Sequence, residues 1–149
     1  MNLVFALSPL LAVGIGALLL MLAEAFAKTR NGLALGAAMI FFSAFALSLG
    51  VWMNGTEGLG TEALAPWLVI DRFSLFFNCV LALGGALAAL LAGGYLPEHH
   101  LDHGEFYSLL LLSTFGAMML AASGDLLTLF LGLETMSLGV YALTAFRRS

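Results

Sequence analysis

The sequence contains very few charged residues. Only 9% of its 149 residues are charged, with five Lys or Arg and nine Asp or Glu, whereas 62% are hydrophobic. An average soluble domain is about a quarter charged. A water-soluble fold of this size cannot bury so much apolar surface, so an ordinary soluble domain is excluded. The few basic residues form no cluster, which excludes a nucleic-acid-binding surface.

Cysteine is almost missing as well. Cys79 is the only one, so an internal disulfide is impossible, and its apolar surroundings favour a small core residue. The sequence has no phosphate-binding loop, dinucleotide fingerprint, Cys-x-x-Cys pair or nucleophile elbow. It therefore shows no redox or hydrolytic site of its own.

Long apolar runs take the place of these features. About 20 apolar residues are needed to span the hydrocarbon core of a bilayer as a helix. Backbone groups in lipid cannot bind water, so each such run is predicted to be helical. The sequence therefore predicts an all-α, polytopic transmembrane bundle, a single membrane domain over residues 1–149. Its five predicted helices are Leu3–Ala27, Gly32–Met53, Phe73–Leu96, Phe106–Gly124 and Leu126–Phe146.

The C-terminal end of the first run suggests an alternative to a transmembrane helix, namely a cleaved signal peptide. The triplet Ala25–Ala27 has the small residues of a cleavage site. However, no positive segment precedes the run, and the run is too long for the apolar part of a signal peptide. The sequence therefore favours a transmembrane helix here.

The positions of Lys and Arg predict the orientation in the membrane. Lys28 and Arg30 follow the first helix, and Arg147 and Arg148 follow the fifth, so alternation places all four on one side. Arg72 stands alone on the other side. The side with more Lys and Arg is normally cytoplasmic. We therefore expect the N-terminus outside and the C-terminus in the cytoplasm.

Two local patterns predict how the helices pack. Gly85, Ala89 and Gly93 recur at every fourth residue, a spacing that lets helix backbones approach closely in a membrane. Only a short turn separates the fourth and fifth helices, so these two are predicted to be antiparallel neighbours. Asp125 in that turn is a candidate N-cap for the fifth helix.

Glu134 is the residue most indicative of function. It lies eight positions after Leu126, about 12 Å along a helix that rises 1.5 Å per residue, and so near the middle of the membrane. An acidic side chain at that depth costs about 2.5–3.5 kcal/mol on insertion scales, and by default indicates an ion pathway. The alternative is a permanently protonated structural glutamate that is hydrogen-bonded to a neighbouring helix.

Three hydroxyl residues accompany Glu134 on the fifth helix. At about 100° per residue, Ser137 and Tyr141 fall within about 60° of Glu134, and Thr144 lies near the edge of that face. Such a stripe can hold a water chain from mid-membrane towards the cytoplasmic end. The alternative is that these hydroxyls bond to backbone or to adjacent helices.

The loop between the third and fourth runs contains three histidines. His99 and His103 have the i,i+4 spacing of a helical zinc site, with His100 between them. Pro97 and Gly104 leave little room for a helix, so a solvated loop is the favoured interpretation.

The last two runs resemble a known family. Residues 105–111 read EFYSLLL, residues 121–138 read AASGDLLTLFLGLETMSL, and residues 70–74 read IDRFS. These segments resemble the antiporter-like membrane subunits of bacterial NADH-quinone oxidoreductase, respiratory complex I, and among them subunit N. Leu133 stands where the sister subunits usually have Trp, and Gly139 where the family commonly has Pro.

The resemblance implies a membrane-arm subunit that takes part in proton translocation coupled to quinone reduction. Glu134 matches the family's glutamate, which works with lysines on later helices. NADH, FMN, iron–sulfur clusters and quinone are expected on partner subunits, among them other membrane subunits of complex I. The implied location is the bacterial cytoplasmic membrane, with lipid as a further partner.

The family has many more helices than the five predicted here. The resemblance therefore implies that the chain corresponds to the N-terminal third of a family member, with residues 106–149 as the start of the proton-translocating core. The chain would then be either a gene fragment or one piece of a split subunit. Two other interpretations stay open. The chain could belong to a cation/proton antiporter without redox chemistry, or it could be a non-functional membrane fragment.

Overall fold

In the part of the chain that it describes, the computed structural model has five α-helices. It describes residues 2–26, 33–54, 67–69, 72–98 and 105–146. The helices are α1 (Asn2–Phe26), α2 (Leu33–Asn54), α3 (Arg72–Glu98), α4 (Glu105–Ala122) and α5 (Leu126–Phe146). The all-α prediction is confirmed, and the predicted helix bounds agree to within about two residues.

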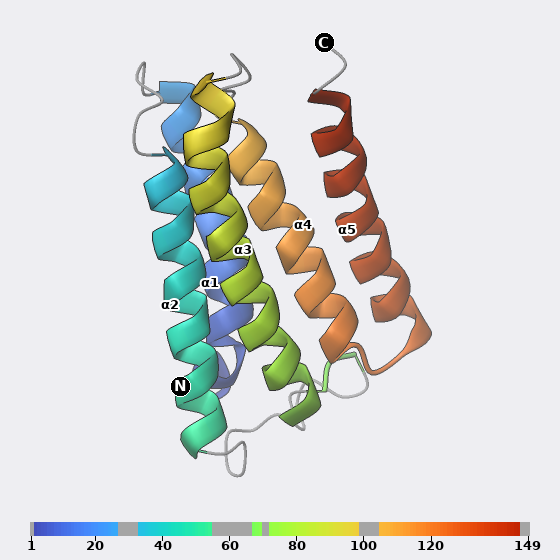
Figure 1. Cartoon of the computed structure of the whole chain (residues 1–149). Helices are drawn as coiled ribbons and strands as arrows, with labels where there is room; N and C mark the ends of the chain where they lie inside the picture. The colour runs from blue at the N-terminus through green and yellow to red at the C-terminus, as the bar shows by residue number, and fades with distance from the viewer. Residues whose placement is uncertain (1, 27–32, 55–66, 70–71, 99–104, 147–149) are drawn as a thin grey trace.

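Successive helices run in opposite directions along one common axis (Figure 1). The first four form a ring in which α1 packs on α2, α2 on α3, α3 on α4, and α4 back on α1. The fifth helix packs on the outer side of α4, at the edge of the molecule (Figure 1). The predicted antiparallel pair of α4 and α5 is therefore confirmed.

Small side chains fill much of the space between the first four helices. Alanines of α2 and α3 are fully buried there, at 0–2% exposure: Ala37, Ala38, Ala44, Ala82, Ala86 and Ala89. Such residues let helices pack closely without a hydrophobic driving force from water. Gly85 lies inside this interface, but it receives the ring of the buried Phe41 rather than a neighbouring backbone.

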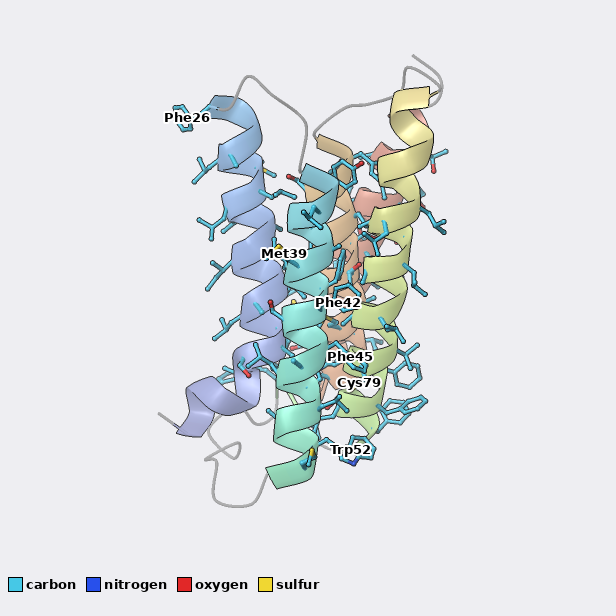
Figure 2. The ribbon with its side chains drawn as sticks, turned by 60° about the vertical axis from the view of Figure 1, so that its left-hand side comes forward. Phe26, Met39, Phe42, Phe45, Trp52 and Cys79 are labelled. Carbon is cyan, nitrogen blue, oxygen red and sulfur yellow. The ribbon has the colours of Figure 1, made fainter. Side chains whose placement is uncertain are left out.

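The outer surface of the bundle is strongly apolar. Large hydrophobic side chains point outward on every face, including Leu18, Met39, Phe73 and Leu91, each more than 60% exposed. Figure 2 shows Met39 and Phe42 on the outer side of α2. Such a surface suits a bilayer rather than water.

Among the described residues, three helices contain apolar spans of 19 residues, long enough to cross a membrane: Leu35–Met53, Phe73–Leu91 and Leu126–Thr144. The apolar parts of α1 and α4, Leu7–Ala23 and Phe106–Ala122, are shorter. They fall at the lower end of the range of roughly 17–25 residues that spanning helices use. Five helices are thus confirmed, whereas five crossings stay a prediction.

Candidate functional site

The fifth helix begins at a well-formed cap. The Asp125 side chain accepts a hydrogen bond from the backbone N–H of Thr128 at 2.9 Å, and its carbonyl accepts one from Leu129 at 3.1 Å. This satisfies N–H groups that would otherwise lack partners at the start of a helix. The predicted N-cap is confirmed, and it fixes the point at which α5 begins.

A short extended segment holds the turn before this cap. The Val69 N–H donates to the Ala122 carbonyl at 2.7 Å, and the Gly124 N–H donates to the Trp67 carbonyl at 2.8 Å. Leu68 and Ser123 form the antiparallel β-bridge between these bonds. The sequence analysis missed this contact, because backbone hydrogen bonds leave no signature in side-chain identity. The predicted fourth helix therefore ends at Ala122 rather than at Gly124.

One face of α5 lies against α4 at very short range. Thr128, Gly132 and Gly139 are the buried residues on this face. A Cβ on Gly132 would lie 2.8 Å from the Leu120 backbone nitrogen, and one on Gly139 would lie 2.7 Å from the Ser113 Cβ. Neither position has room for a side chain. The two helices therefore touch backbone to backbone.

Glu134 lies on the opposite face of α5. It follows Gly132 by two residues, which turns it by about 200° from the contact with α4. Its side chain is exposed, as are Phe130 at 58% and Tyr141 at 69%. The structure thus presents the carboxyl from the middle of α5, away from the four-helix ring.

The other predicted site residues share this side of α5 to different degrees. Tyr141 and Thr144 are exposed, and Ser137 is half-buried. The Thr144 hydroxyl donates to the Val140 carbonyl of its own helix at 2.8 Å, as the alternative interpretation expected for hydroxyls. The arrangement brings Glu134 and Tyr141 together on one open face, with Ser137 at its side. Whether these groups carry protons stays a prediction.

The histidine loop with His99, His100 and His103 lies outside the described residues. Within the part of the chain that the structure describes, no group of three or more His, Cys, Asp or Glu could hold a metal ion. Lys28, Arg30, Arg147 and Arg148 also fall outside it, so the structure leaves the orientation in the membrane as a prediction.

Comparison with known proteins finds relatives that carry the same subunit name. No family model matches the chain. NADH-quinone oxidoreductase subunit N 1 of Sorangium cellulosum is 58% identical over 97% of this chain. Subunit N of Trichlorobacter lovleyi is 35% identical over 76% of it, and subunit N of Protochlamydia amoebophila is 32% identical over 96%.

These relatives are much longer than the chain. It spans 31%, 27% and 29% of their lengths, respectively. The similarity to the first and third covers nearly all 149 residues and thus includes the first two helices, where the motifs of the sequence were weakest. Over the roughly one third of a relative's length that it spans, the chain belongs to the subunit N family of NADH-quinone oxidoreductases.

Proposed function

We propose that the chain forms part of the proton-translocating membrane arm of an NADH-quinone oxidoreductase, with Glu134 as the carboxyl that takes up and releases protons. The observation that carries this proposal is the place of Glu134 in the fold. It projects from the middle of an apolar helix, on the face turned away from the four-helix ring. A structural glutamate would instead be buried against the neighbour that it stabilises.

Energetics require that this face of α5 is covered in the working protein. A carboxyl left in lipid at this depth costs about 2.5–3.5 kcal/mol on insertion scales. No Lys or Arg of the chain lies within its five apolar runs, so a cation at the depth of Glu134 must come from further helices. We propose that these helices supply the lysines that the family resemblance implies.

A lysine in that place would control the charge of Glu134. At about 4 Å and an effective dielectric near 20, the attraction between the two charges is roughly 4 kcal/mol. Moving the ammonium towards or away from Glu134 would therefore alternate between release and uptake of a proton, which is the step that a pump needs. Tyr141 and Ser137 would extend the path along the same face.

The redox part of the reaction belongs to partner subunits in this proposal. Iron–sulfur clusters are usually held by about four Cys thiolates, and this chain has one cysteine. Its residues therefore do not fit a cluster. We propose that NADH, FMN, the clusters and quinone bind elsewhere in the complex, and that the chain contacts other membrane subunits and lipid.

Glu134→Gln in a complete subunit that contains this segment tests the proposal. Glutamine keeps the shape and the hydrogen bonding but cannot titrate. The complex is expected to assemble and reduce quinone, while proton pumping in vesicles falls strongly. Glu134→Asp, which keeps a carboxyl, is expected to retain part of the pumping. Normal pumping by the Gln variant would show that Glu134 is a structural acid.

A further inference from the structure

The Ser113 hydroxyl connects α4 to the backbone of α5. It donates to the Met136 carbonyl at 3.2 Å and is largely buried. The hydroxyls of Thr114 and Thr135 bond within their own helices instead, to the carbonyls of Leu110 and Leu131, each at 2.8 Å. Ser113 therefore makes a cross-helix bond in a position where its neighbours do not.

The bond lies inside the glycine contact between the same helices. A Cβ on Gly116 would lie 2.5 Å from the Met136 nitrogen and 2.9 Å from the Gly132 carbonyl oxygen. Because Gly139 has no side chain, Ser113 has room to lie against α5 at this position. Backbone atoms thus touch on both sides of Glu134 along the axis, where α5 runs beside α4 (Figure 1). Glycine contacts set the distance between the helices, and the hydrogen bond of Ser113 adds a fixed direction to this contact.

A directional bond resists rotation in addition to close packing. The Met136 carbonyl lies two residues beyond Glu134, so a bond to it fixes the height and the rotation of this part of α5. The tips of helix side chains lie about 5–6 Å from the axis, so a rotation of about 20° would move the Glu134 carboxyl by about 2 Å. Moving from about 4 to about 6 Å from a cation weakens the attraction by about a third.

The geometry points to Ser113 as a positioning residue for Glu134: its bond to Met136 sets the direction in which α5 presents the carboxyl. This inference rests on the proposed function for its meaning, but its physical content is the rotation of α5. It also explains the glycine at position 139. Any side chain there, including the proline common in the family, would collide with Ser113 and open the contact.

The rotation can be measured on the 149-residue chain itself. Nitroxide labels are placed one at a time along positions 130–141 of the chain in phospholipid vesicles, leaving out Gly132 and Gly139, which have no room for a side chain, on a background without the native cysteine. Their accessibility to oxygen follows the helix period, and its maximum is expected near the face of Glu134 and Tyr141. Ser113→Ala is expected to shift this maximum by roughly 20° or more. Thr114→Ala, which removes a neighbouring hydroxyl bonded within α4, is expected to leave it in place.

A second readout uses the complete subunit. Ser113→Ala is expected to lower proton pumping several-fold while assembly and quinone reduction persist, and Ser113→Thr, which restores the hydroxyl, is expected to recover it. Should Ser113→Ala fail to assemble, Ser113→Cys takes its place, because a thiol is a weaker hydrogen-bond donor than a hydroxyl. It is expected to give a smaller shift of the accessibility maximum and a smaller loss of proton pumping. An unshifted accessibility maximum in the Ala and Cys variants would overturn the inference, even where Glu134→Gln abolishes pumping. A shifted maximum with normal pumping by Glu134→Gln would instead refute only the proposed function.

Discussion

The open position of Glu134 predicts that removing its charge makes α5 a better transmembrane segment. Acidic residues at the centre of a helix cost about 2.5–3.5 kcal/mol on translocon scales, whereas Leu contributes about 0.3–0.6 kcal/mol in favour of insertion. No residue of the ring offsets this cost, since the carboxyl faces away from α4. Glu134→Leu is therefore expected to favour insertion by about 3–4 kcal/mol, a change of roughly a hundred- to a thousandfold.

The assay follows glycosylation of sites on either side of α5 in microsomes, with the segment trimmed until insertion of the native sequence is incomplete. Leu138 provides the matched control, because it is 63% exposed on the same helix one turn further on. Leu138→Glu is expected to lower insertion, and the exchange Glu134→Leu/Leu138→Glu to restore it close to native. The same exchange in a complete subunit is expected to abolish pumping. Equal insertion of native α5 and Glu134→Leu would refute the placement of the carboxyl in the hydrocarbon core.

Three further predictions concern packing, capping and orientation. Gly132→Ala is expected to destabilise the bundle by about 1–3 kcal/mol through overpacking, as measured by unfolding in mixed detergent micelles. Gly84→Ala is the control, because no atom lies within 4 Å of the Cβ that it adds, and it is expected to be neutral or stabilising. Asp125→Ala is expected to cost about 0.5–2 kcal/mol in the same assay, and Asp125→Asn much less, because Asn keeps the cap. For orientation, Phe26 and Met53 lie at opposite ends of the bundle and are both 83% exposed. In a variant without the native cysteine, Met53→Cys is expected to react with an impermeant reagent from outside, and Phe26→Cys only from the cytoplasmic side; the reverse pattern would contradict the positive-inside assignment.

The sequence was sufficient for the helices but not for the contacts between them. The length of each apolar run and the polar turn at Asp125 predicted the helix order, the α4–α5 hairpin and the cap, because these depend on local chemistry. The small residues of α3 were predicted to bring backbones together. Instead Gly85 accommodates the Phe41 ring, and the glycines that meet the backbone of a neighbouring helix are Gly116 of α4 and Gly132 of α5. Which small residue meets which partner depends on the whole bundle.

The candidate site shows the same division. The depth of Glu134 and the residues on its side of α5 followed from counting along one helix. Whether that side of α5 faces the other helices or points away from them could not be predicted. A membrane helix is apolar all round, so its periodicity does not mark an inward face. The cross-helix bond of Ser113 could not be predicted either, since a serine on an apolar helix usually bonds within its own turn.

The attachment of α5 to the bundle on one side only, through α4, has a consequence for biogenesis. Of its apolar span only 17% is buried, against 33% and 39% for the spans of α2 and α3. As the chain leaves the ribosome, the first four helices can complete their mutual interface while α5 still has a single neighbour. In the proposed subunit, the hairpin turn, held by Trp67–Val69, would then retain α5 at the side of α4 as the further helices enter the bilayer. In that interval the carboxyl of Glu134 would face lipid, so under the proposed function the energy gained by covering it would favour docking of the further helices against α5 rather than elsewhere on the ring.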